Sequence, residues 1–181
     1  MKKLKYLIAS IFTLTIFILS SCEKIDSTKE WGLAKIYMPQ ANYNPYIVPN
    51  SGTDAQLNKN YSVDKDNGKV NIFLGIYRSG LQALESYSVA ITPLSADLAG
   101  TTLLPADQYT LSTIVTCPDG ARDIIFYLSV NLNFLITNSA TDFSLAVTIS
   151  NPSKYEINED LATTKILINT GELLTKESIA Y

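Results

Sequence analysis

The sequence predicts an all-β protein, an antiparallel β-sandwich of immunoglobulin-like outline with seven or eight strands. Three observations lead to this fold class. Apolar and polar residues alternate in several short segments, which is the period of a half-buried strand. Turn signals containing Gly, Pro or Asn separate these segments. No long segment shows the period of an amphipathic helix.

The segment KVNIFLGIYR at 69–78 shows the alternation most clearly. One face of this strand is apolar and is expected to face the core: Val70, Ile72, Leu74 and Ile76. The opposite face carries Asn71, Phe73 and Tyr77. The same period predicts further strands at 87–92, 123–130, 143–150 and 164–169, and shorter ones at 34–38, 108–112 and 112–116. YSV, at 61–63, is expected to precede the tight link into the long strand.

The connections carry their own signals. DKDNGK, at 64–69, is expected to be a tight link into the long strand, with Asn67 and Gly68 at positive φ. CPDGAR, at 117–122, is expected to close a hairpin that pairs 112–117 with 121–130. The segments ADLAG and LNFLI are expected to form single turns, and residues 171–181 are either a frayed tail or a short helix.

The first 21 residues have the pattern of a secretory signal peptide. A basic group, Lys2, Lys3 and Lys5, precedes an apolar run from Leu7 to Leu19. A helix of this length rises only about 20 Å, whereas a spanning helix must cross about 30 Å of hydrocarbon. The run is therefore interpreted as an export signal and not as a membrane span.

The letters LSSC at the end of this run resemble the lipobox of bacterial lipoproteins. The resemblance implies that the sulfur of Cys22 carries diacylglycerol, that residues 1–21 are removed, and that the new amine is acylated. Several acyl chains anchor durably, since each buried methylene contributes about 0.8 kcal/mol. The polar stretch that follows makes 22–30 a lipidated cysteine and flexible tether. The alternative is a soluble protein secreted through an ordinary cleavage site.

Cysteine use depends on this interpretation. The chain has only Cys22 and Cys117. If Cys22 carries lipid, Cys117 is unpaired and is expected to be a small, partly buried hydrophobe at the end of a strand. A Cys22–Cys117 disulfide arises only if the lipobox interpretation is wrong. A catalytic thiol is not expected, because the chain has no histidine to act as its base.

Charge and composition exclude several classes of function. Without residues 1–21 the chain keeps 11 basic and 17 acidic side chains, a net charge of −6 that argues against nucleic-acid binding. The absence of histidine excludes a Ser-His-Asp triad and every histidine-ligated metal site. Many of the acids lie in predicted turns, where water keeps them ionised: Asp64, Asp66, Asp119 and Asp160. No enzymatic activity is expected.

DKDNG resembles the opening of an acidic calcium loop, but the match fails in detail. Its glycine comes one place early, and the twelfth position counted from Asp64 is Gly75, not a bidentate glutamate. A hairpin turn explains the same residues. No metal site or cofactor is predicted, and calcium held between loops of different strands is the alternative left open.

Four segments together resemble a domain of unknown function found in Bacteroidetes lipoproteins: NIFLGIYRSGLQALESYSVAI, LLPADQYTL, VTCPDGARDIIFYLSVNL and FSLAVTISNPSKYEINE. The domain is similar to the one preceding the catalytic barrel of some family 18 endo-β-N-acetylglucosaminidases. The resemblance covers about residues 31–170, which form a single predicted domain before a C-terminal tail, 171–181. It implies a Calx-beta-like sandwich and an association with carbohydrate capture. No catalytic barrel and no catalytic residues carry over.

Aromatic side chains supply the candidate glycan site. Sugar rings stack their C–H face on aromatic rings while amides hydrogen-bond their hydroxyls. The segment MPQANYNPYIVPN offers Tyr43 and Tyr46 beside Asn44, in a stretch expected to be more loop than strand. Trp31, just after the tether, is a further candidate ring. Packing of these rings against the sandwich is the structural alternative.

Two functions follow from these observations. The first is a lipoprotein of the outer membrane, on its cell-surface or periplasmic face, that binds glycan as a non-catalytic accessory of a polysaccharide-utilisation system. The alternative is an adhesion or scaffold module that docks to an outer-membrane protein partner through a sheet edge or the C-terminal tail.

Overall fold

The computed structural model describes residues 34–50, 59–80 and 83–180, all of which belong to one compact unit, Gly32–Tyr181. Two six-stranded sheets, named sheet A and sheet B, enclose the core. The predicted all-β sandwich is confirmed. The described residues hold 12 strands where seven or eight were expected, and the additional strands include three of only two or three residues: β2, β6 and β11.

Sheet A is built around its longest strand, β4 (Lys69–Arg78). β9 (Asp123–Asn131) runs antiparallel along one edge of β4, and β7 (Tyr109–Leu111) lies outside β9. The other edge of β4 is shared by two short strands, β3 (Tyr61–Asp64) at its start and β1 (Lys35–Tyr37) at its end. β11 (Glu156–Ile157) completes the sheet beside β1.

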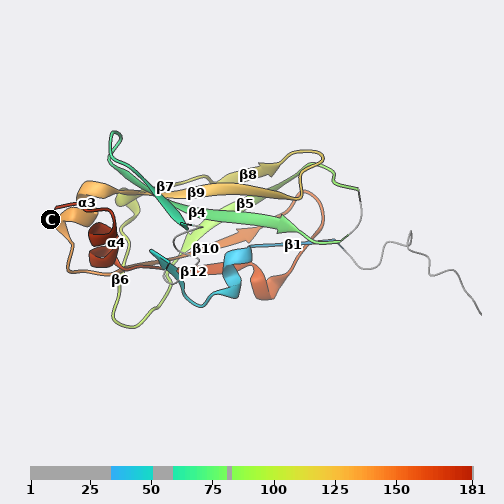
Figure 1. Cartoon of the computed structure of the whole chain (residues 1–181). Coiled ribbons are helices and arrows are strands. Elements are labelled where there is room, and N and C mark those ends of the chain that lie inside the picture. The colour runs from blue at the N-terminus through green and yellow to red at the C-terminus, as the bar shows by residue number, and fades with distance from the viewer. Residues whose placement is uncertain (1–33, 51–58, 81–82, 181) are drawn as a thin grey trace, which may run out of the picture. The chain divides into compact units, whose positions relative to one another are not determined.

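Sheet B follows the order β2 (Tyr46–Val48), β12 (Thr163–Ile168), β10 (Phe143–Ser150), β5 (Tyr87–Leu94) and β8 (Ile114–Cys117). β6 (Thr102–Leu103) pairs with the first residues of β10. Short helices join the strands: η1 (Pro39–Asn42), η2 (Ala106–Gln108), α3 (Leu132–Thr137), η3 (Glu159–Leu161) and α4 (Thr170–Lys176). Figure 1 shows α3 and α4 side by side near the C-terminus.

The core lies between the inner faces of the two sheets, as the alternation predicted. The apolar face of β4 is buried along its whole length, from Val70 to Ile76. The facing residues of sheet B are buried as well: Phe143, Leu145, Val147, Ile149, Ile166 and Ile168. Cys117 is a free thiol at the end of β8, as expected, and it is buried more fully than the partial burial that was predicted.

The β3–β4 hairpin forms at the predicted position, with Asp64 opposite Lys69. Gly68 has a φ of +62°, but Asn67 is not at positive φ, so that part of the prediction is wrong. Asn67 instead donates its backbone N–H and its side-chain amide to the carboxylate of Asp64, at 3.0 and 2.8 Å. These bonds hold the pKa of Asp64 below its ordinary value, and both oxygens of the carboxylate are hydrogen-bonded within the turn.

The predicted hairpin between 112–117 and 121–130 does not form. β8 pairs with β5 in sheet B, whereas β9 pairs with β4 in sheet A. The link 118–122 therefore crosses from one sheet to the other, over the roughly 10 Å that separates packed sheets. Val115 and Cys117 are buried in this arrangement, because β8 turns them toward the core. A local turn signal does not specify which sheet receives the next strand.

Short strands and helices account for the remaining differences between the predicted and the observed elements. β2, β6 and β11 were not expected as strands, because each has only two or three residues and depends on a longer partner for its backbone bonds. LNFLI forms α3, capped by the side chain of Asn131, while ADLAG forms no helix. The segment after β12 forms α4, and its Leu173 and Leu174 are fully buried. In the described part of the chain, no helix is long and apolar enough to cross a membrane.

Glu177, directly after α4, ties this helix to β3. Its Oε1 accepts hydrogen bonds from the hydroxyl of Tyr61 at 2.7 Å and from Nζ of Lys59 at 2.6 Å. Partial burial pushes the pKa of Glu177 up, but the bonds from Lys59 and Tyr61 outweigh it and leave the pKa below its ordinary value of 4.5. The ionised form is therefore favoured in the folded protein, and the contact stabilises the fold at pH values above about 4.5.

We expect Glu177→Gln to lower the free energy of unfolding at pH 7 by about 1–2 kcal/mol, because charge-assisted hydrogen bonds are replaced by neutral ones. The difference in unfolding free energy should shrink as the pH falls below 4.5, because Glu177 of the wild-type protein then takes up a proton and loses its charge-assisted hydrogen bonds. Urea unfolding at pH 7 and at several acidic pH values measures both effects. The control is Glu85→Gln, in the exposed Glu85–Lys154 pair, which should change little. A pH-independent difference for Glu177→Gln would contradict the linkage.

Candidate functional site

The loop predicted to hold the glycan site closes one side of the sandwich. Residues 38–46 carry the chain from β1 in sheet A to β2 in sheet B. The backbone N–H of Gly75 donates to Oε1 of Gln40 at 3.1 Å, and the hydroxyl of Tyr46 donates to the carbonyl of Phe73 at 3.2 Å. Both bonds occupy backbone groups of β4 in the gap between β1 and β3. The loop thus has a structural role along this edge.

Within this loop, the two predicted tyrosines differ in exposure. Tyr43 is 62% exposed, whereas the ring of Tyr46 is half-buried and lies 5.9 Å from that of Tyr43. Burial raises the pKa of Tyr46 to about 12, which keeps its hydroxyl protonated as the donor to Phe73. Tyr43 is therefore the ring of this pair that presents a surface to solvent.

The amide side chains of this loop divide in the same way. Asn44 is exposed and makes no hydrogen bond within the described residues. Gln40 and Asn42 bond to the backbone, at Gly75 and Pro39. The structure therefore brings Tyr43, Asn44 and Tyr46 together on one loop, while Trp31 and the lipid-attachment residue Cys22 lie outside the described residues.

A second group of aromatic residues stands on the outer side of sheet A. We call this group the aromatic face and define it as Tyr37, Phe73, Tyr77 and Tyr127. Tyr37 on β1 pairs with Tyr77 on β4, with ring centroids 5.4 Å apart. Phe73 on β4 pairs with Tyr127 on β9, with centroids 5.6 Å apart in an edge-to-face arrangement. Two ring pairs therefore lie along the same strand.

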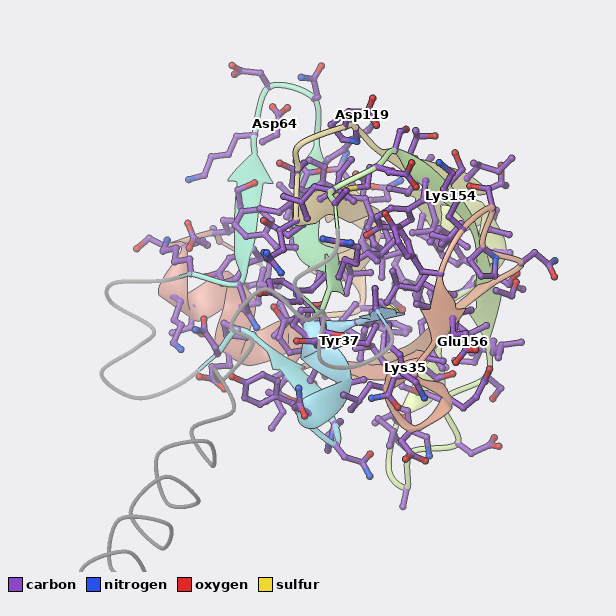
Figure 2. All side chains as sticks on the ribbon, turned by 90° about the vertical axis from the view of Figure 1, so that its right-hand side faces the viewer. Lys35, Tyr37, Asp64, Asp119, Lys154 and Glu156 are labelled. Atoms are coloured by element: carbon purple, nitrogen blue, oxygen red, sulfur yellow. The ribbon has the colours of Figure 1, made fainter. Side chains whose placement is uncertain are left out.

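Strand alternation places the aromatic face outside the core. The neighbours of these residues along their strands, such as Leu74, Ile76 and Leu128, are buried, so the rings point to the opposite side of the sheet. Tyr127 is 50% exposed. Figure 2 shows Tyr37 at the surface, near Lys35 and Glu156. Gly75 stands between Phe73 and Tyr77 on β4 and adds no side chain to the space between the ring pairs.

Sequence reasoning missed the aromatic face, although one signal for it was present. The alternation assigned Asn71, Phe73 and Tyr77 to the outer side of their strand. The partners Tyr37 and Tyr127 come from other strands, and only the pairing register brings them beside β4. The signal that could have found the site was the aromatic character of outward positions on a predicted strand.

The aromatic face continues into polar side chains toward the β3–β4 hairpin. Asn71 lies opposite Ser129 on the neighbouring strand, and the hydroxyl of Ser129 donates to Oδ1 of Asn71 at 2.6 Å. Lys69 and Asn131 form the next row. Two rows of hydrogen-bonding groups therefore lie next to the Phe73–Tyr127 ring pair on one continuous side of the sheet.

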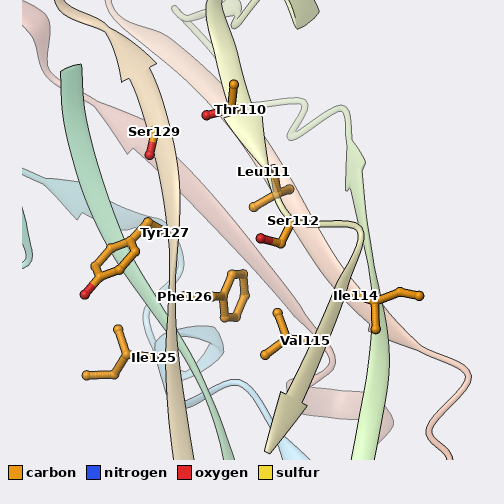
Figure 3. A pocket seen from close by; sticks show the side chains of 9 residues that line it. All are labelled: Thr110, Leu111, Ser112, Ile114, Val115, Ile125, Phe126, Tyr127 and Ser129. Carbon is orange, nitrogen blue, oxygen red and sulfur yellow. The ribbon is translucent and has the colours of Figure 1, made fainter. Parts of the chain in front are cut away.

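A groove of about 550 Å³ lies on the other side of the sandwich, between β9 and β8. β7 covers β9 only at Leu128–Val130, so residues 123–127 have no strand on this edge within the described part of the chain. Figure 3 shows Leu111, Val115 and Phe126 converging on the groove. Two of its lining residues are strongly exposed apolar side chains, Ile114 at 64% and Ile125 at 59%.

These features define a class of protein. The described residues form a two-sheet β-sandwich with aromatic residues on the outer side of sheet A and an open strand edge on β9. No group of three or more Cys, Asp or Glu side chains in the ranges 34–50, 59–80 and 83–180 is arranged to hold a metal ion.

Structural comparison gives neighbours in solved structures at low identity. The apo-form CBD1 domain of Calx is 14% identical, with a TM-score of 0.44, over 76% of this chain and 96% of that chain. A Bacteroides ovatus protein titled "putative carbohydrate binding protein" is 12% identical, with a TM-score of 0.45, over 74% of this chain and 36% of that chain. A multidomain Bacteroides ovatus protein including DUF1735 is 19% identical, with a TM-score of 0.38, over 60% and 36%. No protein-family model and no curated protein matches the chain.

Proposed function

We propose that this chain is a non-catalytic lipoprotein of the outer membrane that binds glycans and serves as an accessory of a polysaccharide-utilisation system. The observation that carries the proposal is the aromatic face, where two ring pairs and rows of hydrogen-bonding side chains share one side of sheet A. The face is part of a regular sheet, so the rings are held in fixed positions before a ligand arrives.

The chemistry of the aromatic face suits a carbohydrate. A sugar ring has an apolar C–H face that packs on an aromatic ring, and hydroxyl groups around its edge that donate and accept hydrogen bonds. Phe73 and Tyr127 offer the first kind of contact, and Asn71 and Ser129, one row further along the strands, offer the second. The loop residues Tyr43, Asn44 and Tyr46 remain a second proposed contact site.

The acidic residues support a role without catalysis. Glycoside hydrolysis uses two carboxyl groups, one of which is kept protonated by a buried environment. Glu156 and Glu159 both line a hollow of about 510 Å³ beside β11, but both side chains are exposed. The chain also contains no histidine that could act as a general acid or base.

A second candidate function, docking to an outer-membrane protein partner, is favoured by the groove between β8 and β9. The edge of β9 at 123–127 offers backbone groups to which an extended segment of the partner could add as a strand. Exposed Ile114 and Ile125 would give that segment apolar contacts. The C-terminal segment is less suited to docking, since Leu173 and Leu174 of α4 are already buried.

Lipid attachment at Cys22 is tested by metabolic labelling with a radioactive fatty acid. We expect the label on the wild-type chain and none on Cys22→Ser, with the variant leaving the membrane fraction, because the thioether and the acylated amine both require the cysteine. Cys117→Ser is the matched control and should keep the label. Equal labelling of the Cys22→Ser variant would contradict the proposed anchor.

Glycan binding is tested with the full chain in mild detergent, screened against mucin glycans and plant polysaccharides with and without calcium. We expect a specific neutral or mucin-type ligand, and we expect Tyr127→Ala to weaken it by about two- to tenfold, the worth of one ring contact. Tyr43→Ala is the matched exposed-tyrosine variant. If only Tyr43→Ala abolishes glycan binding, the binding site lies in the loop and not on the aromatic face. If the folded protein binds none of the glycans in the screen, the glycan proposal is overturned.

The docking candidate predicts that a defined outer-membrane protein cross-links to the chain in intact cells. We expect Ile125→Lys to abolish the cross-link, because a charge on a free strand edge opposes strand addition. Leu94→Lys, at an exposed apolar position on sheet B, is the control and should leave it intact. Equal cross-linking in both variants would exclude the β9 edge as the docking site.

A further inference from the structure

A separate polar hollow of about 310 Å³ lies at the hairpin end of the outer side of sheet A. We call it the amide cleft. Its lining comes from the β3–β4 turn, η2, β7, the end of β9 and the start of α3. Apart from Gly68, every lining residue has a hydrogen-bonding side chain, and six of them are Asn67, Lys69, Asp107, Gln108, Asn131 and Asn133.

Internal hydrogen bonds fix how several of these amides are oriented. Oδ1 of Asn131 accepts the backbone N–H of Phe134 at 3.2 Å, which leaves its amide NH₂ for a ligand. Nε2 of Gln108 donates to Asp107 at 2.8 Å, which leaves the oxygen of Gln108 as an acceptor. Asn67 donates its NH₂ to Asp64 and likewise keeps its oxygen. The cleft therefore presents both donors and acceptors held in set directions.

Charge and size restrict what such a cleft would bind. Among its lining residues Lys69 and Asp107 are charged, and their formal charges cancel, so the lining by itself favours neither an anion nor a cation. A neutral polyol matches a mixed set of donors and acceptors, because each hydroxyl group can donate and accept. A volume of about 310 Å³ is at the lower end of small-molecule sites, so the cleft suits one sugar unit and not a long chain.

The strand register connects the cleft to the aromatic face. Lys69 and Asn131 are paired, and Phe73 and Tyr127 are paired four residues further along the same two strands. Two residues of antiparallel strand span about 7 Å, so the ring pair lies about 14 Å from the Lys69–Asn131 row. Asn71 and Ser129 fill the intermediate row with polar groups.

We propose that the amide cleft binds one neutral sugar unit at the end of a glycan whose following units lie along β4 and β9 toward Phe73 and Tyr127. The inference rests on the proposed glycan-binding function and adds a direction and a specificity to it. The rings would supply contacts that are common to all sugars, while the cleft would distinguish neutral units from charged ones through its fixed amides.

The test uses heteronuclear NMR of the full chain with four neutral monosaccharides, glucose, galactose, mannose and N-acetylglucosamine, and with glucuronic acid as the charged probe. We expect at least one neutral sugar to shift the side-chain amide signals of Gln108 and Asn133, and glucuronic acid to leave them unchanged. The double variant Gln108→Ala/Asn133→Ala should weaken that binding by about tenfold or more, the worth of two hydrogen bonds. Asn158→Ala, an amide outside the cleft whose side chain makes no capping hydrogen bond to η3, should leave it unchanged.

The outcomes separate this inference from the function on which it rests. Weaker monosaccharide binding in the double variant, with Tyr127→Ala affecting only longer glycans, supports the cleft. If a glycan binds and is lost with Tyr127→Ala while the double variant binds normally, the cleft is overturned and the glycan-binding function stands. If no monosaccharide shifts the amide signals while a longer glycan from the screen binds, the cleft is overturned and the glycan-binding function stands. If both the monosaccharides and the longer glycans fail to bind the folded chain, both are overturned. Equal binding of glucuronic acid overturns the proposed specificity.

Discussion

The pairing of β4 with β9 is the interaction on which the rest of the structure depends. Nine consecutive residue pairs, from Lys69 with Asn131 to Tyr77 with Asp123, join the two strands. Side chains alternate between the faces of a sheet, so a shift by one residue would move every buried side chain of one strand to the outside. The same register that buries Leu74 and Leu128 brings Phe73 beside Tyr127 on the outer side. The core and the proposed binding face are thus set by one set of backbone bonds.

The two sides of the sandwich are completed differently. On one side, the segment between β1 and β2 crosses from sheet A to sheet B, and Gln40 and Tyr46 occupy the backbone groups of β4 that no strand covers. On the other side, β7 ends at Leu111 and the chain crosses to β8, which leaves the edge of β9 uncovered at 123–127. Tyr46, a residue type that often lines ligand sites, therefore helps to close the first side through its bond to β4. The second side has no such cover and contains the groove between β8 and β9.

The sequence was sufficient for those parts of the structure that depend on local pattern. Alternation located β4, β5, β9, β10 and β12, and the turn signal at 64–69 located the first hairpin. The sequence was not sufficient where the place of a strand depends on a partner that is distant in sequence. β8 joins sheet B through β5, and β2 exists only beside β12. The same limit applies to the site. Tyr43 and Tyr46 were found because they are neighbours in sequence, whereas Tyr37 and Tyr127 reach Tyr77 and Phe73 only through strand pairing.

The aromatic face and the strand edge are not independent surfaces. Tyr127 belongs to the aromatic face and also lines the groove between β8 and β9, and Thr110 and Ser129 line both this groove and the amide cleft. A strand added along the free edge of β9 would lie directly beside Tyr127 and extend the outer side of sheet A. A glycan lying along β4 and β9 would then contact a sheet that is one strand wider. The added strand would also cover one side of the Tyr127 ring. Because both surfaces use the same strand, a partner on the edge would change the affinity for a ligand on the face, and the reverse coupling would be equal in free energy.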